Sequence, residues 1–218
     1  MIKAVLFDMD GVLVDSREAN RKFKIELFKR AGYGDIDLEH IEGFHKPMQT
    51  VITEALASKG VTDKKEIDRV FNLMFDSAVR EVQDFKFPKD LESTLEELGK
   101  RFDLGIVTSR IRFGIDEIFK LRPIEKYFDV VISFDDCLNH KPHPEPLQKA
   151  LQKLKLSPAE AIYIGDSDTD IIAASAIDMP SIHLSEAKHE LAHHQVFDFD
   201  EIVNAIKLIE NNYAYSNS

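Results

Sequence analysis

Short apolar runs alternate with helical patterns along most of the chain. The runs are rich in β-branched and aromatic residues, which is typical of strands buried on both faces of a parallel sheet. They are Ile2–Phe7, Asp103–Val107, Asp129–Ser133, Ala161–Ile164 and a weaker run at Ser181–Leu184. Between them, apolar residues recur at helical spacing at Leu91, Leu95 and Leu98, and at Leu147, Ala150, Leu151 and Leu154. This alternation predicts an α/β fold with a Rossmann-like, doubly wound parallel sheet.

The stretch from about Arg17 to Phe87 breaks this alternation because it contains no convincing strand. Its apolar residues recur every three to four positions, as on the core-facing side of helices. They are Met48, Val51, Ile52, Ala55 and Leu56 in one segment, and Ile67, Val70, Phe71, Met74, Phe75, Ala78 and Val82 in another. We therefore predict a core domain, residues 1–15 and 89–218, and an inserted all-helical cap domain, residues 16–88. A lid over the active site is one use of such an insert.

Composition narrows the range of partners. The chain has 218 residues, long enough for a sizeable core, and a formal net charge of −11. With no block of basic residues, it is not expected to bind nucleic acid or an anionic membrane. The single cysteine, Cys137, cannot form an internal disulfide, and Met1 is followed at once by a predicted strand rather than a signal sequence. We expect a cytoplasmic monomer or homodimer that acts on a small molecule.

Chemically active polar residues follow each of the first four apolar runs. Asp8 and Asp10 follow the first, Thr108 and Ser109 the second, Lys141 comes shortly after the third, and Asp166 and Asp170 follow the fourth. Aspartate is common in turns and threonine is common in strands, so one such residue alone would carry little weight. The carboxyl ends of parallel strands, however, lie on one edge of a sheet, where ligands bind. The four segments are therefore expected to form one site.

Electrostatics indicates what this site holds. Two carboxylates about 5 Å apart repel by roughly 3 kcal/mol at an effective dielectric constant of about 20. A cluster of aspartates therefore predicts a hard divalent cation, and Mg²⁺ commonly shares its site with phosphate oxygens. Lys141 adds positive charge, and Thr108 and Ser109 add donors for phosphoryl oxygens. One carboxylate can then attack phosphorus while a second, two residues away, donates a proton, so that an aspartyl phosphate forms and breaks down.

These segments resemble the four motifs of the haloacid dehalogenase superfamily, in order. They are Asp8-Met-Asp-Gly-Val-Leu-Val-Asp-Ser16, the run ending in Thr108, Lys141-Pro-His-Pro-Glu-Pro146 and Gly165-Asp-Ser-Asp-Thr-Asp170. The resemblance extends from Met1 to about Leu184. The helical insert is similar to the cap of the branch that contains phosphoglycolate phosphatase and β-phosphoglucomutase.

The resemblance implies a role for each matching residue. Asp8 would be the nucleophile, and Asp10 the general acid/base whose backbone carbonyl also binds the metal. Mg²⁺ would be held by Asp8, Asp10, Asp166 and Asp170. Thr108 would bind the phosphoryl group, Lys141 would bridge it to the nucleophile, and Gly11 would allow the tight backbone after the paired aspartates.

Two further features of the resemblance concern the reaction and the packing. Dehalogenases lack an acid at the position of Asp10, and phosphonate-cleaving members have a small residue there, so Asp10 favours phosphate esters. Ile177-Asp178 departs from the branch, which usually has glycine at this point; this departure bears on packing rather than on chemistry.

Three residues are candidates for substrate selection. The stretch Glu42-Gly-Phe-His-Lys-Pro-Met-Gln49 resembles the cap loop that reaches the leaving group in this branch. His45 and Lys46 are therefore candidate substrate-binding residues, although Lys46 is equally well explained as a solvated surface lysine. Arg110, directly after Thr108-Ser109, is a further candidate.

A competing motif lies near the end of the chain. His189-Glu190-Leu-Ala-His193 matches the H-E-x-x-H pattern of zinc peptidases. The segment is short, the chain looks extended soon after it, and no clear third ligand follows, so we expect a polar surface helix instead.

The sequence thus predicts a phosphoric monoester hydrolase that uses Mg²⁺ and a phosphorylated Asp8. A sugar-phosphate mutase with the same core is the alternative, because the two differ in cap closure and water exclusion. A zinc metallopeptidase through His189 and His193 is a remote alternative. A non-catalytic phosphate-binding regulator is disfavoured because a binding module has no need of the Asp8/Asp10 pair.

Overall fold

The structure is a computed structural model that describes residues 1–37, 48–76 and 85–216, with side chains up to residue 211. The chain divides into two compact units. The core unit comprises Met1–Val14 and Phe87–Ser218, and the insert unit comprises Asp15–Lys86.

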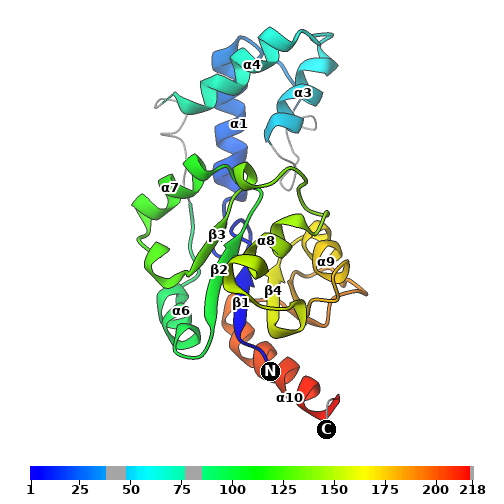
Figure 1. Ribbon diagram of the computed structural model, residues 1–218. Helices are drawn as coiled ribbons and strands as arrows, with labels where there is room; N and C mark the ends of the chain where they lie inside the picture. The colour runs from blue at the N-terminus through cyan, green and yellow to red at the C-terminus, as the bar shows by residue number, and fades with distance from the viewer. Residues whose placement is uncertain (38–47, 77–84, 217–218) are drawn as a thin grey trace. The chain divides into compact units, whose positions relative to one another are not determined.

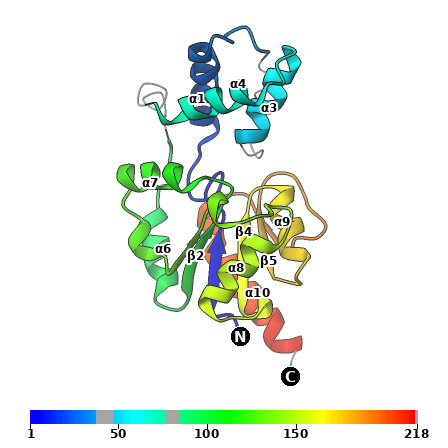
Figure 2. The ribbon, with the colours of Figure 1, turned by 45° about the horizontal axis from the view of Figure 1, so that its top comes forward.

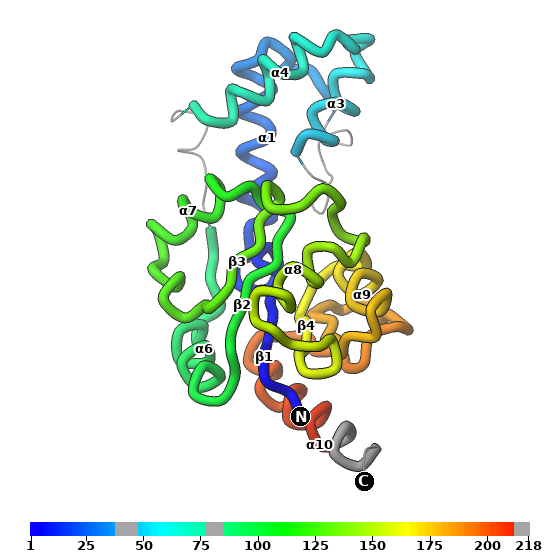
Figure 3. Tube along the Cα trace, viewed as in Figure 1, coloured from blue at the N-terminus to red at the C-terminus, as the bar shows by residue number. Residues whose placement is uncertain are grey.

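The core unit is built around a six-stranded sheet in which every pairing is parallel (Figure 1). The strand order is β3-β2-β1-β4-β5-β6, so the first strand lies in the middle (Figures 2 and 3). The strands are β1 (Ala4–Phe7), β2 (Asp103–Val107), β3 (Val130–Ile132), β4 (Ala161–Gly165), β5 (Ser181–Leu184) and β6 (His194–Val196). The predicted α/β parallel sheet is confirmed, and β6 is an additional strand at its edge.

Helices of the core unit pack on this sheet and bury the apolar stripes seen in the sequence. They are α6 (Leu91–Gly99), α7 (Arg112–Leu121), α8 (Glu145–Leu154), α9 (Asp168–Ser175) and α10 (Ile202–Ser216). Helix α8 contacts β2 and β3, α9 contacts β4 and β5, and α10 contacts β6. Leu147 and Leu151 of α8 share one buried cluster with Leu6 and Tyr163 of the sheet. The strands are therefore buried where they present the site residues. Short 3₁₀ turns at Glu125–Tyr127, Phe134–Asp136, Pro158–Glu160 and Phe199–Glu201 complete the unit.

The insert unit contains α1 (Arg17–Ala31), α3 (Met48–Ser58) and α4 (Lys64–Asn72), followed by a 3₁₀ turn at Leu73–Phe75. Its core joins Phe23 and Leu27 of α1 to Ile52 and Leu56 of α3 and to Val70 of α4. The two ends of the unit are held together, because Asp15 N–H donates to the Lys86 carbonyl and Lys86 N–H donates to the Asp15 carbonyl, at 2.8 and 3.1 Å.

Helix α4 ends earlier than its apolar pattern predicts. The pattern continues to Val82, but the helix ends at Asn72, and Asp76 has extended backbone angles (φ −70°, ψ 128°) that end the helical path. Ala78 and Val82 lie outside the described residues. Within the residues that the structure describes, no helix has the length and apolar character needed to cross a membrane.

Candidate active site

The register of three neighbouring strands brings the sequence motifs to one edge of the sheet. Phe7 of β1 pairs with Ile106 of β2 on one side and with Ile164 of β4 on the other. Asp8 N–H continues the ladder by donating to the Ile164 carbonyl at 2.8 Å. The residues that follow β1, β2 and β4 therefore lie next to one another, as expected from the strand ends.

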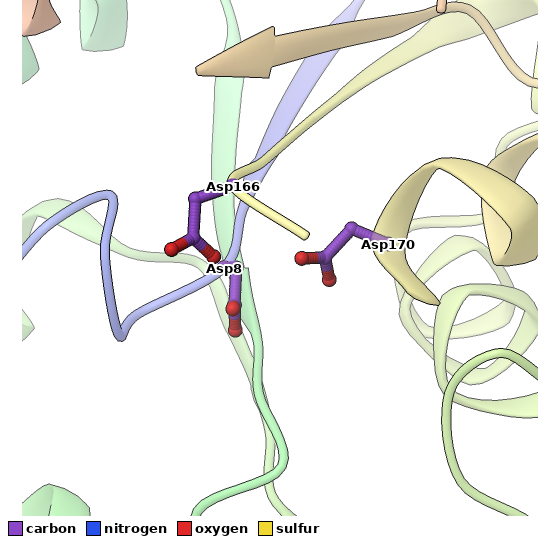
Figure 4. Close-up of side chains that lie close together, drawn as sticks. All are labelled: Asp8, Asp166 and Asp170. Carbon is purple, nitrogen blue, oxygen red and sulfur yellow. The ribbon is translucent and has the colours of Figure 1, made fainter. Parts of the chain in front are cut away.

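Three carboxylates from two of these segments form a cluster. One oxygen each from Asp8, Asp166 and Asp170 lies within 4.8 Å of the others. Figure 4 shows Asp8 and Asp166 at the ends of their strands and Asp170 reaching toward them from α9. Asp170 is fully buried, and Asp8 is only 7% exposed. This is the one group of three or more potential metal ligands among the described residues.

The cluster carries more negative charge than its surroundings support. Burial raises the pKa of Asp8 to about 7, and the nearby Asp170 and Asp10 add to this increase, although Lys141 opposes it. Burial also raises the pKa of Asp166 to about 8, with further contributions from Asp8 and Asp170. A set of oxygen donors whose mutual repulsion is only partly offset fits a hard divalent cation.

A buried lysine lies against the same carboxylates. Lys141 Nζ is 3.0 Å from Asp8 Oδ1 and 2.5 Å from Asp170 Oδ1, and its side chain is 3% exposed. Burial alone would lower the pKa of Lys141, but Asp170 and Asp8 outweigh it and raise the pKa above its ordinary value. For Asp170, burial alone would raise the pKa, but Lys141 and hydrogen bonds from Ser167 and Tyr163 outweigh burial and lower the pKa below its ordinary value. Lys141 and Asp170 are therefore both ionised at neutral pH.

The strand-end pattern does not identify Tyr163, which lies inside β4. Its hydroxyl accepts a hydrogen bond from Lys141 Nζ at 2.9 Å. The same hydroxyl lies 2.9 Å from Asp170 Oδ1 and 3.0 Å from the Val107 carbonyl oxygen, so it can donate to either. The sequence contains one signal for it, because a tyrosine within a fully buried strand needs a partner for its hydroxyl.

Ser167 is a second residue that the strand-end pattern leaves out. Its hydroxyl donates to Asp170 Oδ2 at 2.5 Å, and its backbone N–H donates to the same oxygen at 3.1 Å. This is a capping box at the start of α9. The Ser-x-x-Asp spacing of such a box is visible in the sequence. Ser167 thus fixes the orientation of the Asp170 carboxylate.

Two glycines make room for the carboxylates. Gly11 has φ +79°, and a Cβ there would lie 1.8 Å from Asp166 Oδ2. A Cβ on Gly165 would lie 2.3 Å from the Cβ of Asp170. Any side chain at either position would displace a member of the cluster, and Gly11 has the tight backbone expected of it.

Asp10 lies outside the cluster and pairs with Arg110. Arg110 Nε and Nη2 donate to the two oxygens of the Asp10 carboxylate at 2.7 and 2.6 Å. Arg110 N–H donates to Thr108 Oγ1 at 3.1 Å. Thr108 is buried, and Ser109 between them is half-buried. Thus Asp10 and three successive residues after β2 form a second group beside the cluster.

The structure does not test the two cap candidates, and it corrects the prediction for the H-E-x-x-H motif. His45 and Lys46 lie outside the described residues. The expected surface helix at His189–His193 is wrong, because the segment is a turn leading into β6, where His193 N–H donates to the Ser181 carbonyl at 3.0 Å. Without a helical turn, His189 and His193 lack the spacing that the zinc motif requires.

The departure at Ile177-Asp178 has a physical explanation. Asp178 has φ 53°, which is in the left-handed region. Glycine reaches this region without strain, and aspartate is among the residues that tolerate it best.

Comparison with known proteins agrees with this geometry. Residues 5–184 match the family model described as haloacid dehalogenase-like hydrolase. Pyrophosphatase PpaX of Anoxybacillus flavithermus is 33% identical over 172 residues, which cover 79% of this chain and 78% of that protein.

Solved structures show the same fold. A putative phosphoglycolate phosphatase from Lactobacillus plantarum aligns with a TM-score of 0.76 and 25% identity, covering 94% of this chain and 99% of that one. β-Phosphoglucomutase from Clostridium difficile aligns with a TM-score of 0.80 and 23% identity, covering 99% and 100%. The family match over most of the chain confirms the predicted family and enzyme class: the protein belongs to the haloacid dehalogenase-like hydrolases.

Proposed function

We propose that this protein is a Mg²⁺-dependent phosphohydrolase that cleaves a small phosphorylated metabolite through a phosphorylated Asp8. The observation that carries the proposal is the contact of one buried lysine with two clustered carboxylates, Lys141 with Asp8 at 3.0 Å and with Asp170 at 2.5 Å. A nucleophilic carboxylate beside a fixed cation is suited to attack on an anionic phosphoryl group.

The metal would be held by Asp8, Asp166, Asp170 and the backbone carbonyl of Asp10. It would supply positive charge that offsets the carboxylates and the phosphoryl oxygens. The preference for Mg²⁺ follows from the all-oxygen donor set.

In the first half-reaction, a carboxylate oxygen of Asp8 forms a bond to phosphorus while the bond from phosphorus to the leaving oxygen breaks. Asp10 donates a proton to that oxygen. Lys141 offsets the charge on the transferred group, and Thr108 and Ser109 donate hydrogen bonds to its oxygens. In the second half-reaction, Asp10 takes a proton from water as the water oxygen bonds to phosphorus, and the bond from phosphorus to Asp8 breaks. Orthophosphate leaves, and Asp8 and Asp10 return to their starting states.

The insert unit is proposed to act as a cap over this site, with core residues 1–15 and 89–218 and cap residues 16–88. His45 and Lys46, outside the described residues, would contact the leaving group from the cap. Support comes from the helical make-up of the insert unit and from its position directly after the motif that carries Asp8 and Asp10.

The names of the relatives suggest where to look for the substrate. PpaX is a pyrophosphatase, and one structural neighbour is a putative phosphoglycolate phosphatase. We propose a substrate in this range of small phosphorylated compounds. With a net charge of −11, the chain would attract such an anion through the local charge of Lys141 rather than through its surface.

The test is phosphate release from pyrophosphate, phosphoglycolate, sugar phosphates, nucleotides and p-nitrophenyl phosphate, with Mg²⁺ or with EDTA. We expect release only with Mg²⁺, abolished in Asp8→Asn and slowed roughly 10²- to 10⁴-fold in Asp10→Asn. Asp103→Asn is the matched control, because Asp103 is an exposed aspartate at the far end of β2. Transfer of phosphate within a sugar phosphate without net release would favour the mutase, and undiminished release by Asp8→Asn would contradict the proposal.

A further inference from the structure

The Arg110–Asp10 pair is more enclosed than an ordinary surface ion pair. The Arg110 and Asp10 side chains are 13% and 19% exposed. Two parallel bonds of 2.7 and 2.6 Å join them. This bidentate geometry is the one by which arginine recognises carboxylate and phosphate groups.

Arg110 is held firmly in this position by its own backbone and by its neighbours. Its N–H donates to Thr108 Oγ1 at 3.1 Å, and its carbonyl accepts from Phe134 N–H at 2.8 Å. A Cβ on Gly114, in the first turn of α7, would lie 3.5 Å from Arg110 Nη1. The guanidinium is therefore fixed two residues beyond the proposed phosphoryl-binding Thr108, on the side of Asp10.

This pairing affects the proposed reaction. Both Asp10 oxygens accept from Arg110, so Asp10 can carry a proton to a leaving oxygen only after the pair opens and the freed carboxylate takes up a proton from water. Opening the pair costs Arg110 two charge-assisted bonds at a place with little access to water, which is unfavourable. An anionic group on the leaving part of the substrate would replace the carboxylate and remove this cost.

We infer that Arg110 binds a second anionic group of the substrate, on the leaving side of the scissile bond, and that this exchange releases Asp10 for proton transfer. The inference rests on the proposed function. It assigns the substrate to phosphate esters or anhydrides whose leaving part carries its own phosphate or carboxylate. Inorganic pyrophosphate is the simplest probe of this class.

The kinetic test compares pyrophosphate with p-nitrophenyl phosphate, whose leaving part carries no phosphate or carboxylate. In Arg110→Ala, we expect kcat/KM to fall on the order of 10²-fold for pyrophosphate and by less than about threefold for p-nitrophenyl phosphate. Arg110→Lys keeps the positive charge but cannot donate two parallel hydrogen bonds. Its kcat/KM for pyrophosphate should therefore lie between those of the wild type and Arg110→Ala. The matched control is Arg112→Ala, which removes a half-exposed arginine paired with Asp116 and Glu125 and should leave both substrates unchanged.

A binding measurement separates this inference from the proposed function. In the Asp8→Asn background, calorimetry should show that Arg110→Ala weakens pyrophosphate binding at least about tenfold and leaves orthophosphate binding unchanged. Equal losses for the two anions, or equal kinetic losses for the two substrates, would overturn the role of Arg110. Absence of phosphate release from every substrate by the wild-type protein would instead overturn the proposed function, while the binding comparison would still decide the role of Arg110.

Discussion

The core unit and the insert unit each contain a cluster of one cation, one carboxylate and one tyrosine, but in different surroundings. In the core unit, Lys141, Asp170 and Tyr163 are buried. In the insert unit, Tyr33 donates to Glu66 at 2.8 Å and Arg69 pairs with the same carboxylate at 2.7 Å, with the arginine 47% exposed.

The difference shows how burial changes the charge balance of such a cluster. Water screens the charges around Glu66, whose pKa is lowered to about 2 by hydrogen bonds from Arg69 and Tyr33. In the core, Lys141 is shared between Asp170 and Asp8, while Asp8 keeps a raised pKa because of burial. The same residue types thus stabilise one unit locally and, in the other, leave a charge for a ligand to balance.

The largest effect is expected from removing the cation of each cluster. Lys141→Met leaves Asp8 and Asp170 buried without it and should cost about 3–5 kcal/mol of unfolding free energy and nearly all activity. Arg69→Met should cost about 1 kcal/mol or less, because the pair is half-exposed. Urea denaturation measures both, and similar losses in the two variants would remove the distinction between the clusters.

Removing one hydroxyl gives a smaller effect. Tyr163→Phe keeps the buried ring but takes a partner from Lys141 and Asp170, and should cost about 1–3 kcal/mol. It should also lower kcat more than KM, because the lysine loses its fixed position. Tyr33→Phe removes a hydroxyl from the part-buried Glu66 carboxylate, where water can replace it, and should cost less unfolding free energy than Tyr163→Phe. Chemical denaturation measures the loss of stability in both variants, and steady-state kinetics measures the activity of Tyr163→Phe. A wild-type kcat in Tyr163→Phe would show that the Tyr163 hydroxyl does not position Lys141.

The two units should respond to pH with opposite signs. The pKa values of Asp8 and Asp166 are about 7 and about 8 in the folded chain, above their ordinary value of 3.8. Their protonated forms therefore favour folding, and this contribution is lost as the pH rises through about 7 and 8. The pKa of Glu66 is lowered, so its contribution is present above its ordinary value of 4.5 and is lost as the pH falls toward about 2.

Thermal unfolding with EDTA and with Mg²⁺ measures the core effect. We expect Mg²⁺ to raise the midpoint more at about pH 8 than at about pH 5, because the ion replaces protons on the cluster. Asp166→Asn is the control and should reduce both the pH dependence and the Mg²⁺ effect. A Mg²⁺ effect that does not change with pH would contradict the proposed exchange of protons for the ion on Asp8 and Asp166.

The smallest effects concern two left-handed residues, one in each unit. Lys155, at the end of α8, has φ 60°, and Gly32, at the end of α1, has φ 89°. Lys155→Gly should stabilise the chain, and Gly32→Ala should destabilise it, each by about 1 kcal/mol. Thermal unfolding midpoints of the two variants test this prediction. If Lys155→Gly lowered the midpoint, a contact of the Lys155 side chain would outweigh the strain of its left-handed backbone.

The strands and the acidic cluster could be predicted from the sequence because both follow from local rules. Buried strands read as apolar runs, and a parallel register carries the residues after them to one edge, as for Asp8 and Asp166. Contacts that depend on tertiary packing could not be predicted. The Tyr163 hydroxyl is placed by β4 facing α8 and α9, and the Arg110–Asp10 pair joins residues 100 positions apart.

Local exceptions account for the remaining errors. Between Asn72 and Asp76, a 3₁₀ turn and one extended residue interrupt the helix, although the apolar spacing at Met74 and Phe75 continues. The segment after β5 is held in a turn by the pairing of His193 with Ser181, which no helical period reveals. In both cases one backbone conformation or contact outweighs the pattern of side chains.

The proposed reaction requires that Asp8 carries the phosphoryl group during turnover. Mass spectrometry of the acid-quenched enzyme, after mixing with Mg²⁺ and its best substrate, tests this most directly. We expect a peptide containing Asp8 that is heavier by one phosphoryl group, present during turnover, gone when the substrate is exhausted and absent from Asp8→Asn. Steady phosphate release with no phosphorylated Asp8 at any time, and an equal rate in Asp8→Asn, would contradict it.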